Sequence, residues 1–288
     1  MDSPDIQELL EQAGNLSDEG KKTEAVALYE QVIQLSPDWS VPYYNLGLLY
    51  KYDCQWEKSF YYNQKAVELA PDEEAGWWNL GIAATALKKW RLARQSWNFF
   101  GLDYELNDDE PTEAIGRSPV RINPEDEAEV VWCNRLDPAR AIIENIPLPT
   151  TGHRLGDMVL NDGAPMGYRV SEGKEYPVLN ELQLLQPSGL RTWSVRVKNC
   201  KQKHIDKLIK LSDDARVEVE DWSTIQWLCK KCSEGILHEE HDHELKNDDP
   251  AERYVGFASE SKKPIEQVLM KWRVLTFRSH SKVILELE

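Results

Sequence analysis

The chain has 288 residues, and its 34 Lys and Arg stand against 50 Asp and Glu, which gives a formal net charge of −16. A charge this negative argues against nucleic acid or an anionic membrane as the ligand, because both require a basic binding surface, and it favours a basic partner instead. With 41% hydrophobic residues the chain can bury a core, and its length indicates two or three domains.

The first hundred residues repeat with a fixed spacing. Asn-Leu-Gly at 45–47 recurs at 79–81, and the X-Pro-Asp of 36–38 recurs at 70–72, each time 34 residues later. Glycine lets two helices approach closely, and proline ends a helix because it cannot continue the hydrogen-bond ladder. Such units bury a continuous face only by stacking, so we expect three stacked helical units.

A 34-residue period in a helical background rich in Ala, Leu and Tyr resembles the tetratricopeptide repeat. The resemblance covers residues 1–107, as repeats of about 6–39, 40–73 and 74–107. The signature positions of the last two repeats hold Tyr43, Leu46, Gly47, Tyr50, Ala66 and Pro71, then Trp77, Leu80, Gly81, Ala84, Ala93 and Trp97. The first repeat keeps only those of its second helix, Ala25, Tyr29, Val32 and Pro37. The resemblance implies a helical solenoid that binds other proteins.

The resemblance also implies where a partner would lie. In this family the first helix of each unit lines a concave groove, and the repeat register places there Tyr44, Leu48, Lys51, Tyr52, Trp78 and Ile82. Tyr44 and Trp78 occupy equivalent places one repeat apart, and exposed aromatic rings favour a partner that covers them. The alternative is that the chain's own strands cover the groove, with Trp90 and Trp97 capping the open end of the array.

One subclass of the family captures chaperone tails, and this sequence departs from its pattern. That subclass holds a C-terminal carboxylate with a clamp of Lys, Arg and Asn. Here only Asn45 fits the clamp, while the other four places hold Leu10, Gly14, Ala75 and Asn79. Capture of a chaperone tail is therefore not expected.

Residues 108–127 are acidic and punctuated by proline, without an apolar period, which predicts a linker. The charge of the chain is unevenly distributed around this segment. Residues 1–110 hold 20 acids and 9 bases, a net charge of −11. The acidity and the expected groove therefore coincide in the repeat region.

Residues 128–190 predict a small β-rich domain. Its short apolar runs are separated by Gly, Pro and Asn clusters and lie at 130–133, 141–143, 157–160 and 178–185. The third run, followed by Asn161-Asp162-Gly163, resembles the strand and turn of an SH3-like barrel, although any small antiparallel barrel produces the same pattern.

Residues 191–288 predict a ferredoxin-like α+β module. Strand and helix periods follow one another as strand 193–197, helix 203–211, strand 216–220, insertion 222–250, strand 254–257, helix 264–275 and strand 282–287. The whole chain is thus expected to be a multidomain protein, with an α-helical solenoid followed by β-rich and α+β modules. Such a fold says nothing by itself about activity, because unrelated functions share it.

The insertion carries the strongest chemical signal of the sequence, from Cys229, Cys232, His238, His241 and His243. A C-x2-C pair turns both thiolates towards one point, so a structural zinc site is expected from both Cys, His238 and either His241 or His243. The short gap between Cys232 and His238 argues against an ordinary zinc-finger pattern. The alternative is a surface loop that holds two reduced thiols.

Catalytic patterns fail or are absent. His238 and His241 are three residues apart and so miss the i, i+4 spacing of zinc hydrolases, and no phosphate-binding Gly-rich loop or nucleophile elbow occurs. We therefore expect a non-enzymatic protein that binds a basic protein partner through the groove, as an inhibitor, an immunity-type protein or a scaffold. The alternative is a metal-dependent enzyme with its site around residues 229–243.

Location follows from what the sequence lacks. The first residues show no basic stretch followed by an apolar one, so no secretory signal is expected. No run approaches about 18 apolar residues, so no membrane helix is expected. Five scattered Cys do not resemble a disulfide framework, and the reducing cytoplasm is the expected location.

Overall fold

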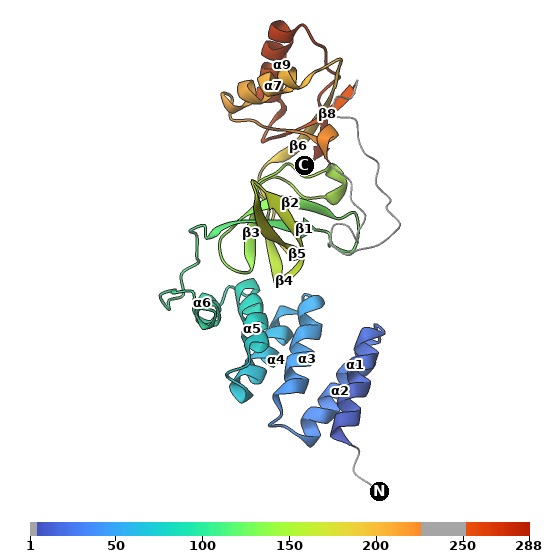
Figure 1. Ribbon diagram of the computed structural model, residues 1–288, viewed down its shortest axis with the longest axis vertical. Coiled ribbons are helices and arrows are strands. Elements are labelled where there is room, and N and C mark those ends of the chain that lie inside the picture. Colours follow the sequence, from blue (N-terminus) through green and yellow to red (C-terminus); the bar gives the residue numbers. More distant parts are fainter. Residues whose placement is uncertain (1–4, 226–251) are drawn as a thin grey trace. The chain divides into compact units, whose positions relative to one another are not determined.

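The computed structural model describes residues 5–225 and 252–288. The chain divides into two compact units, residues 1–113 and 114–288. The first unit is helical and the second is rich in β-strands, as the colours along the sequence in Figure 1 show.

The first unit consists of three consecutive helix pairs. Their bounds are α1 Ile6–Asp18, α2 Lys22–Leu35, α3 Ser40–Tyr52, α4 Trp56–Leu69, α5 Glu74–Ala86 and α6 Trp90–Phe99. The first helices of successive pairs begin 34 residues apart, and so do the second helices. The predicted repeat is therefore confirmed in all three units, including the first, whose leading helix has few signature residues.

Two glycines set how closely the helices of a pair approach. A Cβ atom at Gly47 would lie 2.5 Å from the side chain of Asn63, and one at Gly81 would lie 2.6 Å from the ring of Trp97. No real Cβ tolerates these distances, so only glycine allows α3 to pack on α4, and α5 on α6, at this separation. The packing role that the sequence predicts for these glycines is confirmed.

The second unit begins with a closed five-stranded barrel. Its strands are β1 Gly116–Ile122, β2 Glu129–Arg135, β3 Arg140–Ile143, β4 Met158–Ser171 and β5 Lys174–Gln186. Consecutive strands pair antiparallel, and β1 closes the barrel by pairing in parallel with β5. This parallel closure is unavoidable, because the first and last strands of an odd-numbered meander run in the same direction. The core is formed by Val120, Ile122, Val131, Cys133, Ala141, Ile143 and Val159.

The predicted linker over residues 108–127 is wrong in its second half, because β1 lies there. Its sequence does not look like a core strand, since Arg117 and Arg121 interrupt the apolar pattern and Pro119 lacks a backbone donor. Arg121 is nevertheless buried, and its guanidinium donates to Asn180 Oδ1 at 3.2 Å. The barrel domain therefore starts before residue 128.

The turn predicted at residues 161–163 is also wrong. β4 continues through this segment, and shifts in its register against β5 mark bulges there. The chain turns at Glu172 and Gly173, which have φ angles of 52° and 76°. Two central residues with positive φ are typical of a two-residue hairpin, whose twist matches that of the strands.

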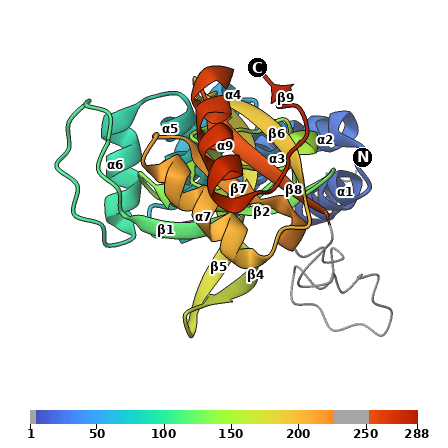
Figure 2. The same cartoon turned by 90° about the horizontal axis from the view of Figure 1, so that it is seen from above.

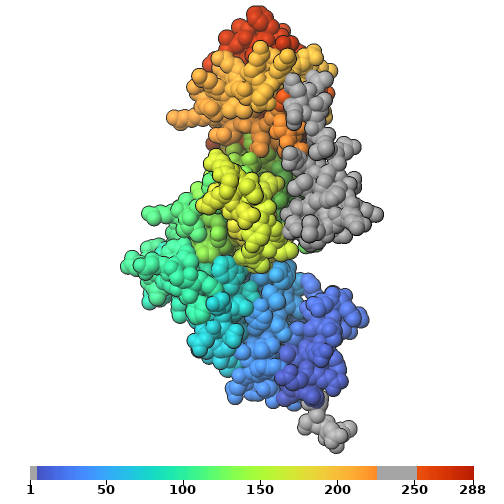
Figure 3. Space-filling model, viewed as in Figure 1, coloured from blue at the N-terminus to red at the C-terminus, as the bar shows by residue number. Residues whose placement is uncertain are grey.

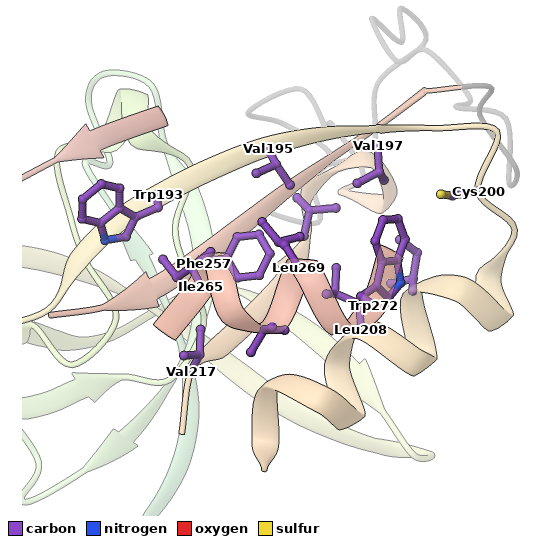
Figure 4. Packing of buried hydrophobic residues seen from close by; sticks show 13 residues of the cluster. Trp193, Val195, Val197, Cys200, Leu208, Val217, Phe257, Ile265, Leu269 and Trp272 are labelled. Atoms are coloured by element: carbon purple, nitrogen blue, oxygen red, sulfur yellow. The ribbon is translucent and has the colours of Figure 1, made fainter. Parts of the chain in front are cut away.

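A four-stranded sheet with two helices on one face completes the second unit. The elements are β6 Arg191–Lys198, α7 Gln202–Asp213, β7 Glu218–Asp221, β8 Glu252–Ser259, α9 Lys262–Thr276 and β9 Ile284–Leu287. The strand order is β7-β8-β6-β9, with all neighbours antiparallel. Figure 2 shows α7 and α9 over these strands, and Figure 4 shows Val195 and Val197 on β6 close to Leu269 and Trp272 on α9.

The other face of this sheet packs against the barrel. Ile146, Trp222 and Ala258 form a buried cluster, and the indole of Trp222 donates to the carbonyl of Ile146 at 2.8 Å. A Cβ atom at Gly256 would lie 2.3 Å from the Trp222 ring, so glycine is required beneath it. The sheet therefore contacts the barrel domain through this cluster, which is separate from the barrel core and from the core beneath α7 and α9. None of the helices in the described ranges is long and apolar enough to cross a membrane.

Candidate functional site

The six residues expected in the groove lie on α3 and α5 but differ in exposure. Tyr52 is 58% exposed, and Tyr44, Leu48 and Trp78 are half-buried. Lys51 and Ile82 are buried, with 3% and 0% of their surface exposed. Tyr44, Leu48 and Tyr52 are spaced four residues apart and therefore follow one face of α3. We call these three residues the α3 stripe.

Tyr52 is the most exposed aromatic residue of the α3 stripe. The Nζ atom of Lys51 lies 4.4 Å from the centroid of its ring, within the range of a cation–π interaction. This contact restricts the ring while leaving most of its surface open. A restrained, exposed aromatic ring is the kind of residue that anchors a protein partner.

Trp78 is engaged in packing within the repeat region. Its ring meets Trp97 at 5.3 Å and Phe100 at 4.8 Å between centroids, both edge to face. Trp97 is 1% exposed and covers Gly81, so it fills the space between α5 and α6 and does not cap the array as the sequence suggested. Of the two aromatic residues expected to line the groove, Trp78 is thus part of the internal packing.

The segment after α6 covers the end of the helical array. Asn98 donates from Nδ2 to the carbonyl of Tyr104 at 2.8 Å and accepts from the Tyr104 N–H at 2.7 Å. Arg91 donates to the carbonyl of Leu106 at 3.3 Å, and Arg94 donates to that of Asp109 at 2.8 Å. Sequence reasoning missed this cap, although Arg91, Arg94 and Asn98 follow the helical spacing i, i+3, i+7 ahead of an acidic segment.

The barrel contains a buried histidine–carboxylate pair that the sequence did not suggest. His153 Nε2 lies 2.7 Å from Glu181 Oε1, and both side chains are less than one-tenth exposed. Burial lowers the pKa of His153, but the bond to Glu181 and the charge of that carboxylate raise it above the ordinary value. Glu181 also accepts the backbone N–H of Asn123 at 3.0 Å. Glu181 therefore joins both the segment before β4 and the β1–β2 turn to β5.

Two further carboxylates bind the backbone of residues 145–148, the segment that follows β3. Glu129 accepts the N–H of Leu148 at 2.8 Å, and Glu220 accepts the N–H of Ile146 at 2.7 Å. Burial raises the pKa of Glu129 to about 7, opposed by the Leu148 bond and reinforced by the charge of Glu220. Burial raises the pKa of Glu220 as well. Each of these contacts lies within the second unit, so the cluster belongs to its internal structure.

The Glu129 carboxyl predicts how the stability of the second unit depends on pH. Its folded pKa of about 7 exceeds the ordinary 4.5, so the stability it contributes is complete below pH 4.5 and is lost as pH rises through 7. Glu129→Gln stays neutral and retains an acceptor for Leu148. We expect it to raise the urea midpoint at pH 8 and to leave the midpoint at pH 5 nearly unchanged.

The control for this prediction is Glu175→Gln, which removes an exposed carboxylate from β5. Arg169 and His153 also act on the Glu129 carboxyl, and both lower its pKa, so hydrogen exchange at Leu148 should accompany the urea titrations. An equal gain at both pH values would contradict the assignment, because it would not arise from titration of Glu129.

The expected zinc ligands Cys229, Cys232, His238, His241 and His243 lie outside the described residues. Within residues 5–225 and 252–288, no group of three or more His, Cys, Asp or Glu side chains is arranged to hold a metal ion. Among the other cysteines, Cys133 is buried in the barrel core.

No protein-family model and no curated protein matches the chain. Among solved structures it is similar to the TPR domain of Sgt2 from Aspergillus fumigatus, with 20% identity and a TM-score of 0.32, over 34% of this chain and 64% of that one. It is also similar to the second TPR of Spaghetti (RPAP3) bound to an HSP90 peptide, with 19% identity and a TM-score of 0.32, over 33% and 89%. A TPR2B domain of yeast Sti1 in a pHsp70 complex gives 17% identity and a TM-score of 0.31, over 33% and 75%. All three likenesses cover about a third of this chain.

Proposed function

We propose that this chain, whose N-terminal third is a tetratricopeptide-repeat region, is a non-enzymatic protein that captures a basic protein partner on the α3 stripe. The observation that carries the proposal is the exposed ring of Tyr52 in line with Tyr44 and Leu48. These residues lie in a segment, residues 1–110, that has a net charge of −11. Aromatic side chains would anchor the partner, and the surrounding carboxylates would steer it and set its orientation.

The partner proposed here differs from a chaperone tail. One of the similar structures holds an HSP90 peptide, but four of the five clamp positions in this chain are Leu10, Gly14, Ala75 and Asn79. None of these side chains carries a positive charge to hold a terminal carboxylate. The acidic repeat region favours a partner whose apolar anchors are surrounded by Lys and Arg.

Removal of the stripe tests this function. We expect Tyr44→Ala with Tyr52→Ala to weaken partner binding by about 2–4 kcal/mol, the range for aromatic anchors. The measurement is capture on the immobilised chain from a lysate of the native source, followed by calorimetry with the captured protein. Trp78→Ala should lower thermal stability, because Trp78 packs on Trp97 and Phe100.

The matched control is Tyr61→Ala on α4, since Tyr61 is 53% exposed and Tyr52 is 58% exposed. Capture should remain at the level of the unmodified chain in this variant and should weaken as salt concentration rises. Capture that is unaffected by the double substitution, or capture that does not weaken as the salt concentration rises, would refute the proposal.

Two versions of this function differ in what happens to the captured protein. An inhibitor or immunity-type protein covers a basic active site, whereas a scaffold leaves its partner active. Titrating the captured protein with the chain, and following its own activity, separates the two. Complete loss of activity at one equivalent favours the inhibitor.

We also propose fold classes for the two modules that follow the repeats, and a zinc site. The element order β-α-β-β-α-β supports a ferredoxin-like class for residues 191–288, and five short closed strands support an SH3-like class for the barrel.

Zinc bound through Cys229 and Cys232 would be structural. One equivalent of zinc in the purified chain, lost in Cys229→Ser, tests it. A turnover lost in the same folded variant would favour the alternative, a metal-dependent enzyme.

A further inference from the structure

The helix α9 is apolar on its solvent face as well as on its buried face. Ile265, Val268, Leu269 and Trp272 face the core, as expected for a surface helix. On the opposite side Met270 is 63% exposed, Val274 67% and Phe277 92%. Met270 and Val274 are four positions apart and lie on one side of the helix, and Phe277 follows directly after its last residue. These three residues are here called the α9 stripe. The C-terminal end of the chain is red in Figure 3, where part of it lies at the surface.

Phe277 occupies a backbone conformation that is unfavourable for its type. It follows the last turn of α9 with a φ of 54°, in the left-handed region where glycine is strongly preferred. A bulky residue is disfavoured there relative to glycine, because its Cβ atom comes too close to the following carbonyl oxygen. The chain thus combines local strain with the exposure of a large apolar ring. Strain of this kind is found where a residue serves function more than folding.

Basic side chains surround the α9 stripe. Lys263, Lys271 and Arg273 on the same helix are exposed, whereas the acid Glu266 is paired with Lys262 at 3.0 Å. Residues 262–278, which include α9, hold five Lys and Arg against one acid, Glu266. Two copies of α9 facing each other would place these cations together, which argues against a symmetric contact between identical stripes.

We propose that the α9 stripe of one copy of this chain binds the α3 stripe of a second copy. The inference rests on the proposed function of the α3 stripe and names its partner. The α9 stripe presents apolar anchors surrounded by cations, and the α3 stripe lies in a segment with a net charge of −11. Tyr44 to Tyr52 spans about 12 Å along α3, and Met270 to Phe277 about 10 Å along α9, so the stripes match in length.

A contact between two different surfaces of the same chain is heterologous. In such a pair one copy retains an unused α3 stripe and the other an unused α9 stripe, so a third copy can add to the first two. The structure therefore assigns a head-to-tail assembly that grows with protein concentration. Opposite charges surround the contact between the two stripes, so the assembly should weaken as salt screens these charges.

Sedimentation velocity of the full chain at low and high salt tests the inference. We expect species larger than the monomer at low salt, increasing with concentration and dissociating at high salt. Val274→Ser with Phe277→Gly removes two anchors, and the glycine also relieves the strained backbone, so this variant should fold and be monomeric. Tyr44→Ala with Tyr52→Ala should be monomeric as well.

Mixing the two double variants gives the decisive result. The first keeps an intact α3 stripe and the second an intact α9 stripe, so an equimolar mixture should form 1:1 dimers and nothing larger. Val170→Ser is the control, because Val170 is 69% exposed on β4 and Val274 is 67% exposed on α9. It should assemble like the unmodified chain.

Three outcomes overturn the inference. The unmodified chain stays monomeric at low salt, or the mixture remains monomeric, or the Tyr variant assembles as the unmodified chain does. Binding of the α9 stripe to vesicles with anionic lipid, lost in the Val274→Ser and Phe277→Gly variant and without self-association, would assign it to a membrane surface. If the chain is monomeric but the Tyr variant loses capture of a basic partner, the inference fails and the proposed function stands.

Discussion

Trp97→Ala is expected to destabilise the last helix pair by about 3–5 kcal/mol, the range for truncating a buried tryptophan. Trp97 is 1% exposed, covers Gly81 and contacts Trp78 edge to face at 5.3 Å. Its removal leaves a cavity between α5 and α6. Hydrogen exchange should show the loss of protection at residues 74–99 first, and it is the suitable measurement because a chain of several units does not unfold in one step.

The reciprocal substitution tests the same contact from the other side. Gly81→Ala places a methyl group 2.6 Å from the Trp97 ring, and we expect a loss of about 1–3 kcal/mol from overpacking. In a Trp97→Leu background the same change should cost clearly less, because the smaller side chain leaves room. Additive effects in this double-mutant cycle would show that the two residues do not share a space. A loss of stability below about 1 kcal/mol for Trp97→Ala would also show that the Trp97 ring does not fill a tightly packed space.

Asp137→Ala is expected to destabilise the barrel by about 3–5 kcal/mol, because it removes one partner of a buried ion pair. Asp137 Oδ2 accepts from Arg140 Nε at 2.6 Å, and both side chains are 1% exposed. Asp137 Oδ1 also accepts the backbone N–H groups of Ala139 and Arg140 at 2.9 and 2.8 Å. The substitution thus removes the hydrogen bonds of the β2–β3 turn as well as a carboxylate from a buried guanidinium.

An exposed ion pair in the same barrel supplies the control. Arg117 Nε lies 2.5 Å from Glu144 Oε2, but the two side chains are 58% and 34% exposed. Glu144→Ala should therefore cost at most about 1 kcal/mol. Urea unfolding followed by hydrogen exchange in the barrel strands measures both variants. Similar losses for Asp137→Ala and Glu144→Ala would show that burial does not decide the strength of these pairs.

The charges of the chain are segregated in a way that bears on both proposals. Residues 1–110 have a net charge of −11, whereas residues 262–278 hold five Lys and Arg against one acid. A net charge of −16 for the whole chain conceals this basic segment. Charges separated along one chain favour binding between unlike surfaces, whether of two copies or of two proteins.

The sequence predicts the repeat region well because its structure is local. Each helix contacts mainly its neighbours in the chain, and residues such as Gly47 and Gly81 recur at 34-residue spacing, so the period reports the packing directly. The strands with alternating or continuous apolar residues, such as β6 and β8, are predicted for the same reason. Their positions agree with the expected strands at 193–197 and 254–257 to within a few residues.

Buried charges are where sequence reasoning fails. Arg121 interrupts the apolar pattern of β1 and indicates a surface segment, yet it is 2% exposed and bonded to Asn180 from β5. The carboxylate that pairs with the buried His153 belongs to Glu181, which lies 28 residues away in the sequence. A charged side chain looks the same in the sequence whether water or a distant carboxylate neutralises it.

By itself the sequence determined the 34-residue helical repeat, the concentration of acid within it and the alternation of strands and helices near the C-terminus. Only the tertiary structure decided that β1 closes a barrel on β5, that Trp78 packs on Trp97 while Tyr52 stays exposed, and that α9 carries apolar residues on both faces. The physical reason is the distance along the sequence between the residues that make contact. Periodicity records contacts between neighbouring elements, whereas closure, pairing of buried charges and exposure depend on residues that only the folded chain brings together.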